Sequence, residues 1–284
     1  MARMGLHISI SEGLHKAVDR AKDRGCDVFQ IFSQSPRSWN SKSLSDDDAH
    51  EFVSSFRKSG LALAVDHMPY LPNLASSKED VHEKSIDALT SELMRCQMLR
   101  IPYLVSHLGS HLGAGWDEGF KRIVEAVDTS LSQADNGVIL LLENTAGTKN
   151  SMGSSLEEIA TIIDAFDTLR PRLGICLDTC HLFAAGYELR TPEGLQATLN
   201  QFQELIGLER LMLLHINDCR GAMGSHLDRH EHIGLGQIGE NGFRLILRHP
   251  SLKDLPMVLE TPVDSRRNDV ANLQAARELA SWPK

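Results

Sequence analysis

The stretch LGICLDTCH at residues 173–181 combines a short apolar run with a carboxylate and an imidazole directly after it. A continuous apolar run of this length is typical of a strand that is buried on both faces. The change to Asp, Thr and His marks the point where the strand reaches an edge of its sheet. The stretch therefore predicts a buried strand that delivers polar side chains to that edge.

The same pattern recurs along the chain. Eight apolar or β-branched runs are predicted to be strands: Gly5–Ile10, Val28–Phe32, Ala62–Asp66, Tyr103–Ser106, Val138–Leu142, Leu173–Leu177, Leu211–Ile216 and Pro256–Leu259. Segments between them are predicted to be helices, among them Ser45–Ser59, Lys78–Leu99, Trp116–Gln133, Ser155–Phe166 and Pro192–Ile206. Buried strands that alternate with helices indicate a parallel sheet covered on its outside. The fold class is therefore α/β, and eight such units predict a (β/α)8 TIM barrel. The alternative to a closed barrel is an open doubly wound sheet. The chain is expected to form a single domain over residues 1–284.

Composition narrows the class of protein. Hydrophobic residues make up 42% of the 284 residues, which is enough for one large core. No apolar run approaches the ~20 residues that span a bilayer, and the N-terminus lacks the apolar region of a signal peptide. The five cysteines are scattered, which is typical of a reducing compartment. We therefore expect a cytoplasmic protein that does not enter a membrane.

Polar side chains follow six successive predicted strands. In a parallel barrel, catalytic residues come from the carboxyl ends of the strands. The leading residues at these ends are His67, His107, Glu143, Asp178, His215 and Glu260. Neighbouring members of the series are separated by about one strand plus one helix, so the barrel would direct all six toward one central region. The loop after the seventh strand adds His226, Asp228, His230 and His232.

So many ionisable side chains in one place would be costly to bury without a counter-charge. Divalent cations supply that charge, and imidazoles with carboxylates favour zinc, followed by manganese or iron. With His181 included, the candidate ligands number nine: His67, His107, Glu143, Asp178, His181, His215, Asp228, His230 and Glu260. A catalytic zinc takes three protein ligands and a water, so the set fits three ions better than one. Clustered divalent ions are suited to phosphate-ester hydrolysis.

Several motifs resemble those of the endonuclease IV family of zinc-dependent apurinic/apyrimidinic (AP) endonucleases, AP endonuclease family 2. They are GLHIS at residues 5–9, HMPYLPNL at 67–74, ENTAG at 143–147, GICLDTCH at 174–181, HIND at 215–218 and DRHEHIGLG at 228–236. The resemblance spans nearly the whole chain. Two parts of it are highly specific: the motif at residues 174–181, and the motif at 215–218 together with the one at 228–236. Pro69 departs from the Asp-Ser that some members carry in this loop, and only a local effect is expected.

The resemblance implies a centre of three zinc ions. The first ion would be held by His67, His107 and Glu143. The second would be held by Glu143, Asp178, His215 and Glu260, and the third by His181, Asp228 and His230. Glu143, which bridges the first two ions, and Glu260 are expected to be the catalytic carboxylates. Mn2+ could replace Zn2+ at one of these sites.

The implied reaction is hydrolysis of the phosphodiester 5′ to an abasic site in duplex DNA by a hydroxide that bridges zinc ions. The products would be a 3′-hydroxyl and a 5′-deoxyribose phosphate, and blocked 3′ ends would also be trimmed. An abasic nucleotide has no stacked base and flips out easily, so specificity must come from shape. The positions matching the family's gap-filling side chains are Arg37, Tyr70 and Leu71, and Arg229 is a candidate phosphate contact. Without the resemblance, Arg37 and Tyr70 would be interpreted as a solvated loop residue and a capping aromatic.

The net charge of −9 is unusual for a protein that binds nucleic acid. Three Zn2+ ions would offset six of these charges, and a positive site at the barrel mouth can coexist with an acidic exterior. Two rival functions use the same fold. A metal-dependent sugar isomerase or epimerase of the xylose-isomerase type usually needs fewer ligands, and His181, Asp228 and His230 speak against it. A barrel that binds DNA or a partner without cutting is disfavoured by the complete ligand set. The protein is expected to be a monomer.

Overall fold

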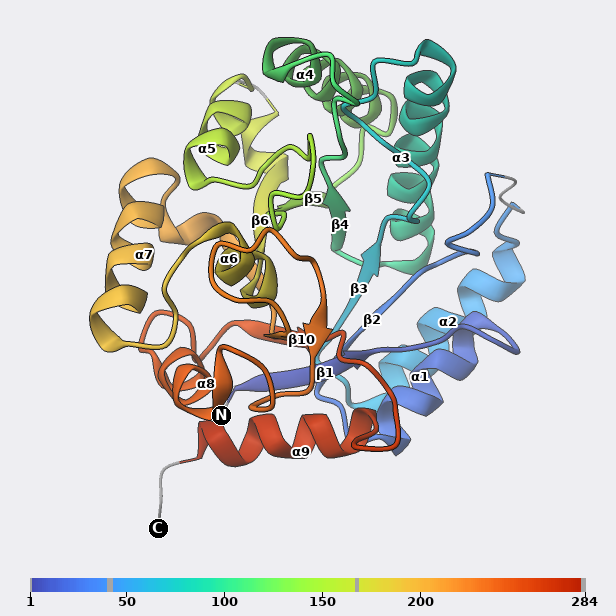
Figure 1. Ribbon diagram of the computed structural model, residues 1–284. Helices are drawn as coiled ribbons and strands as arrows, with labels where there is room; N and C mark the ends of the chain where they lie inside the picture. The colour runs from blue at the N-terminus through green and yellow to red at the C-terminus, as the bar shows by residue number, and fades with distance from the viewer. Residues whose placement is uncertain (1, 40–42, 167–168, 282–284) are drawn as a thin grey trace.

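The computed structural model describes residues 2–39, 43–166 and 169–281. Within them, eight parallel strands pair in the order β1-β10-β7-β6-β5-β4-β3-β2 and close into a barrel. Figure 1 shows these strands at the centre of the molecule, with the helices around them. The barrel strands are β1 (Arg3–His7), β2 (Val28–Ile31), β3 (Leu63–His67), β4 (Tyr103–His107), β5 (Ile139–Glu143), β6 (Leu173–Asp178), β7 (Leu211–His215) and β10 (Pro256–Leu259).

Closure of the barrel decides between the two predicted architectures. β1 pairs in parallel with β10 on one side and with β2 on the other. Every barrel strand therefore has two neighbours, and the sheet has no open edge. The predicted TIM barrel is confirmed, and the open doubly wound sheet is wrong.

The helices cover the outside of the barrel, except for the short helix after β6, which lies at one end. In the described part of the chain they are α1 (Leu14–Asp23), α2 (Asp46–Ser59), α3 (Glu79–Leu99), α4 (Trp116–Gln133), α5 (Leu156–Asp164), α6 (Thr179–Ala185), α7 (Pro192–Leu205), α8 (Gly239–Arg248) and α9 (Asp269–Ala280). Short 3-10 helices η1 (Arg170–Arg172) and η2 (Leu208–Arg210) precede β6 and β7. The five predicted helices all occur. α2 and α7 begin at caps, because Ser45 and Thr191 each accept a backbone N–H from the first turn.

The first strand differs most from its prediction, since it ends at His7 and not at Ile10. Ile8 still donates its backbone N–H to Gln30 O. The chain then turns toward α1 through Glu12 and Gly13, whose φ angles are 67° and 119°. The alternating apolar pattern continued past the strand because Ile8 and Ile10 pack against the core in the turn.

The barrel interior is filled by one residue from each of seven strands: Val28, Val65, Val105, Leu141, Cys176, Leu213 and Val258. A second and larger apolar layer lies between the sheet and the helices. Side chains alternate along a strand, so the residue two positions further along each strand also points into the barrel. These next residues lie closer to the carboxyl ends of the strands.

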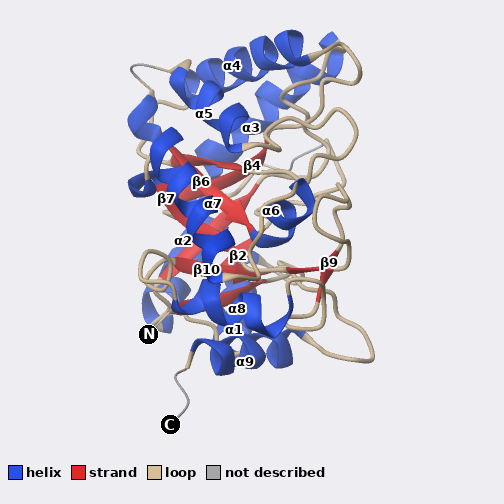
Figure 2. Ribbon diagram, turned by 60° about the vertical axis from the view of Figure 1, so that its left-hand side comes forward, coloured by secondary structure: helices blue, strands red, loops and turns tan. Residues whose placement is uncertain are grey.

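Long loops gather at one end of the barrel, together with α6 and a short hairpin of β8 (Asp218–Cys219) and β9 (His230–Glu231), as Figure 2 shows. None of the described helices is both long and apolar enough to cross a membrane.

Candidate metal centre

The layer above the apolar interior is polar. Two residues beyond the seven interior residues lie Gln30, His67, His107, Glu143, Asp178, His215 and Glu260. β1 adds His7, two residues after Gly5, where a Cβ would collide with Val28 O. Six predicted ligands therefore share one layer of the barrel because the strand period carries them there.

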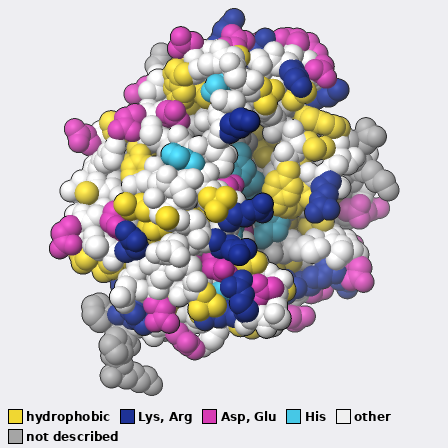
Figure 3. Space-filling model, in the orientation of Figure 1, with side chains coloured by type: hydrophobic (Ala, Val, Ile, Leu, Met, Phe, Trp, Pro, Cys, Tyr) yellow, Lys and Arg dark blue, Asp and Glu magenta, His cyan; other side chains and the backbone are white. Residues whose placement is uncertain are grey.

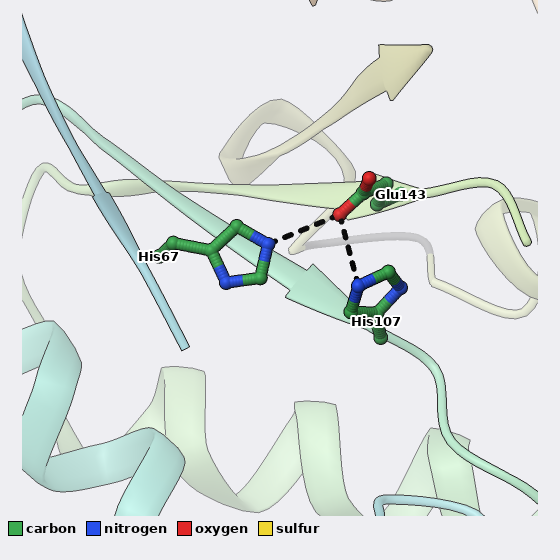
Figure 4. Close-up of side chains that lie close together, drawn as sticks. All are labelled: His67, His107 and Glu143. Carbon is green, nitrogen blue, oxygen red and sulfur yellow. Dashed lines mark hydrogen bonds and ion pairs between the residues drawn. The ribbon is translucent and has the colours of Figure 1, made fainter. Parts of the chain in front are cut away.

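His67 and His107 converge on one oxygen of Glu143, as Figure 4 shows. His67 Nε2 lies 3.1 Å and His107 Nε2 lies 3.5 Å from Glu143 Oε2. His67 Nδ1 donates to Met68 O at 2.8 Å, which leaves Nε2 available to an ion. The three potential ligand atoms lie within 4.8 Å of one another, so they could hold one metal ion.

The other oxygen of Glu143 belongs to a second group. Glu143 Oε1 lies 3.0 Å from His215 Nδ1, which is also 3.4 Å from Glu260 Oε2. Asp178 completes this group, in which each residue places a ligand atom within 4.8 Å of the others. Glu143 faces both groups through different oxygens, which is the arrangement that a bridging carboxylate requires.

The third group forms where α6 meets the loop after β7. His181 Nε2 lies 3.2 Å from Asp228 Oδ1. His230 Nε2 lies 3.8 Å from the same oxygen and 3.7 Å from Asp178 Oδ2. His181 and His230 share a grouping of ligand atoms with Asp178, and Asp228 and His230 share another with Cys180. The three residues predicted as the third set are therefore neighbours, but no grouping of described residues within 4.8 Å holds all three together.

The charges of these groups fit divalent cations. Among the described residues, His230 Nε2 is buried without a hydrogen-bond partner, although it faces two carboxylates. Burial alone would lower the pKa of His181, but Asp178 and Asp228 raise it to about 10. Burial would likewise raise the pKa of Glu143, but His107 and His215 hold it well below its usual value. Nearby positive charge thus favours the ionised form of these carboxylates, and a divalent cation held by them would act in the same direction.

Asp218 ties together the two ends of the loop that carries Asp228 and His230. Its Oδ1 accepts the backbone N–H of Cys219 at 2.8 Å and of Ile238 at 3.0 Å. Its Oδ2 accepts those of Gly234 at 3.0 Å and Gly236 at 2.9 Å. The carboxylate is fully buried, and a Cβ at Gly236 would lie 2.5 Å from Asp218 Oδ1. The loop is therefore built around this one side chain.

Above the polar layer lies an open cavity of about 360 Å³, lined by His67, His107, His181, Asp228 and Glu260 among others. Figure 3 shows histidines at the bottom of a hollow, with Lys, Arg and hydrophobic side chains around its rim. The centre is therefore reachable from solvent, as a site for a large substrate must be.

The predicted DNA-contacting residues lie on loops around this cavity. Tyr70 is 65% exposed and packs edge-on against Phe32 at 5.0 Å between ring centroids, while Leu71 is 37% exposed. The backbone N–H of Tyr70 donates to Pro36 O at 3.2 Å, which joins this loop to the one that carries Arg37. Arg37 and Arg229 are exposed, and neither forms an ion pair with another described residue. Both guanidinium groups are therefore available to phosphate.

Three further histidines, on loops near the centre, have structural partners. His111 Nδ1 accepts the backbone N–H groups of Gly113 and Gly115 ahead of α4. His226 contacts Ala146 O at 3.1 Å, and His232 contacts Asp264 at 3.0 Å. They organise loops and lie outside the four groupings of potential ligand atoms.

Three buried amides contact the candidate ligands and had no role in the sequence prediction. Asn217 Nδ2 donates to Asp178 Oδ2 at 2.6 Å, and its Oδ1 accepts the backbone N–H of Glu260 at 2.8 Å. Asn144 Oδ1 accepts the backbone N–H of Asp178 at 2.7 Å. Gln30 contacts the candidate ligands His215 and Glu260. The only indication of this role in the sequence is that Gln30 is a polar residue within an apolar strand.

The fold and the polar layer define a (β/α)8-barrel protein with a centre that can bind several metal ions. The family described as "Xylose isomerase-like TIM barrel" matches residues 18–284. The chain is 53% identical over 281 residues to "Probable endonuclease 4" of Methanoculleus marisnigri and 49% identical over 282 residues to that of Cenarchaeum symbiosum, with 98% or more of each chain covered. The crystal structure of endonuclease IV from Thermus thermophilus aligns with a TM-score of 0.87, at 36% identity over 98% of both chains.

Sugar epimerases share only the fold. A D-tagatose 3-epimerase-like protein aligns with a TM-score of 0.72 at 18% identity. With full-length relatives at 53% identity, the chain belongs to the endonuclease IV family, and it is a hydrolase.

Proposed function

We propose that this protein is a DNA-repair AP endonuclease that hydrolyses the phosphodiester 5′ to abasic sites in duplex DNA. The observation that carries the proposal is that the nine candidate ligands gather at the carboxyl ends of the strands, where six of them line one cavity. The relatives named endonuclease 4 support the same activity. A sugar isomerase or epimerase would have no use for the third group on the loop after β7.

Three Zn2+ ions are the proposed cofactors. His67, His107 and Glu143 would hold one ion. Glu143 with Asp178, His215 and Glu260 would hold a second, and His181, Asp228 and His230 a third. When bound, such ions neutralise the phosphate, activate water near neutral pH and stabilise the leaving oxygen. Mn2+ remains a candidate at one site, because the ligands are nitrogen and oxygen atoms.

Side chains of the protein would position the metal ions and the DNA. Glu143 and Glu260 are the proposed catalytic carboxylates, since both lie against His215 at the bottom of the cavity. Tyr70 and Leu71 would fill the gap left by the missing base, and Arg37 would stack or contact phosphate from the neighbouring loop. Arg229, beside two proposed ligands, would bind backbone phosphate.

The products would be a 3′-hydroxyl and a 5′-deoxyribose phosphate. The same open cavity would admit a blocked 3′ end, so we propose 3′-trimming as a second use of the centre. Residues 1–284 would work as one domain and as a monomer, which gel filtration of the purified protein would test.

The experiment combines metal analysis with a nicking assay. The protein is purified, its metals are counted by elemental mass spectrometry, and it is incubated with a duplex that carries one tetrahydrofuran abasic analogue. Because this analogue cannot undergo β-elimination, a nick whose 3′ end a polymerase extends must be hydrolytic. We expect about three zinc ions, a nick 5′ to the analogue, and loss of cutting in Glu260→Gln.

The matched control is Glu240→Gln, which changes an exposed glutamate paired with Arg244 on α8. It should cut like the wild type. A fully metal-loaded wild type that leaves the duplex intact would contradict the proposal and direct attention to sugar substrates.

A further inference from the structure

We propose that Gln30 is a positioning residue that decides which atoms of His215 and Glu260 face the metal ion. The inference rests on the metal centre proposed above. Gln30 lies in the middle of β2, in the same layer of the barrel as the ligands, and its side chain is fully buried. Its neighbours on the strand, Phe29 and Ile31, are apolar, so a polar side chain here is a local exception.

The amide of Gln30 contacts two proposed ligands at once. Its Nε2 donates to Glu260 Oε1 at 2.6 Å, and its Oε1 lies 2.8 Å from His215 Nε2. The Nε2 group also lies 3.0 Å from His7 Nδ1. Both amide hydrogens and the amide oxygen therefore have a partner in this layer.

The orientation of the amide follows from what each partner can do. An ionised carboxylate only accepts hydrogen bonds, so the NH2 group of Gln30 must face Glu260. The amide oxygen then faces His215, and because this oxygen only accepts, His215 Nε2 must carry a hydrogen.

The consequence concerns the ligand atoms themselves. With Nε2 of His215 engaged, Nδ1 is the ring nitrogen left for an ion, and it already faces Glu143 Oε1 at 3.0 Å. With Oε1 of Glu260 engaged, Oε2 is left, and it lies 3.4 Å from the same nitrogen. Gln30 thus points one lone pair of each ligand at the second metal position, which is how buried partners of metal ligands raise affinity.

Two substitutions remove both contacts. Gln30→Met keeps a similar volume but can neither donate to Glu260 nor fix a hydrogen on His215 as an amide oxygen does. Gln30→Leu has no polar atom in its side chain and removes the same two contacts with a different shape. Asn136→Leu is the control, because Asn136 also uses its amide in three hydrogen bonds, to Leu93, Val138 and Arg172, away from the centre.

The test measures Zn2+ binding and the protonation of His215. Zinc affinity is determined by competition with a chromophoric chelator, folding is checked by circular dichroism, and the ring nitrogens of His215 are observed by 15N NMR in the zinc-loaded protein. We expect Gln30→Met to bind one ion about 10–100-fold more weakly than the wild type. Gln30→Leu should bind that ion more weakly to a similar degree, and the zinc affinity of Asn136→Leu should be unchanged. Wild-type His215 should carry its hydrogen on Nε2.

The outcomes distinguish this inference from the proposed function. Folded Gln30→Met or Gln30→Leu with wild-type affinity for every ion, or a hydrogen on Nδ1 of zinc-loaded His215, would overturn the role of Gln30 alone. A wild type that binds no zinc would overturn the metal centre on which the inference rests. If Gln30→Met does not fold, Gln30→Leu decides the question.

Discussion

Replacing Asp218 by asparagine should destabilise the protein and release the loop that carries Asp228 and His230. Asparagine has nearly the same shape as aspartate, but only one of its two terminal atoms can accept a hydrogen bond. The four close backbone donors are divided evenly between the two oxygens of Asp218. Whichever way the amide turns, two N–H groups lose their acceptor and face an NH2 group; the pair at Oδ1 is buried and the pair at Oδ2 is partly buried.

The magnitude follows from these two unpaired donors. A buried donor left without a partner costs about 1–3 kcal/mol, so the expected loss in free energy of unfolding is about 2–6 kcal/mol. This is a large part of the ~5–15 kcal/mol that stabilises a typical protein. The loss should be greatest for the loop, because all four donors lie at its two ends.

Two measurements check this prediction in metal-free protein. Urea denaturation gives the global loss, and limited trypsin digestion follows the loop, in which Arg220 and Arg229 are exposed. Asp19→Asn, an exposed site on α1 paired with Lys16, is the control and should change stability by less than about 0.5 kcal/mol. A loss below about 1 kcal/mol with unchanged trypsin cleavage of Asp218→Asn would refute the reasoning.

Three further predictions concern the metals, the substrate and acid. Removing metal with a chelator should lower Tm, and Zn2+ at 100 times its Kd should restore about 2.7 kcal/mol per site; a Tm that ignores both additions would contradict the metal centre. Tyr70→Ala should weaken binding of a duplex with an abasic analogue by about 10–100-fold, the equivalent of losing one stacking contact, while the zinc content stays the same; equal affinity in a fluorescence anisotropy titration would exclude the stacking role. Arg190 lowers the pKa of Glu188 to about 2. The ionised pair therefore stabilises the folded state above the ordinary glutamate pKa, and this contribution disappears as pH falls toward 2. Both side chains are partly exposed, so Glu188→Gln should cost only about 0.5 kcal/mol at pH 7 in urea denaturation, and the difference from wild type should shrink below pH 4.5.

Most of the architecture was predictable from local patterns. Buried parallel strands are apolar along their length, and helices have a different period, so the alternation of the two is visible in the chain. The starts of α2 and α7 lie within one residue of their predicted positions, because the capping residues Ser45 and Thr191 act within one turn. The end of β1 was placed too late because Ile8 and Ile10 continue an apolar pattern that serves the core without remaining in the strand.

The gathering of the candidate ligands was predictable for a related reason. Six of them stand at the ends of apolar strands, and the carboxyl ends of parallel strands meet at one end of a barrel. The sequence could therefore nominate His67, His107 and Glu143 without any knowledge of their distances. Motif resemblance then supplied the reaction and the DNA contacts, which no local pattern contains.

Other features depend on contacts between residues that are remote in the chain. Gln30 meets His215 across 185 residues and Glu260 across 230, and the sequence does not specify which ring nitrogen or carboxylate oxygen each contact occupies. Asp218 is followed by a cysteine and an arginine, and no residue near it in the sequence indicates that four close backbone N–H groups, and a fifth from Gly239 at longer distance, will surround it. Periodicity and residue type act over one strand or one turn, and they were enough to predict the barrel and its polar end. The direction of each hydrogen bond, and hence of each lone pair, was settled only when the closed barrel brought distant strands within 3 Å of one another.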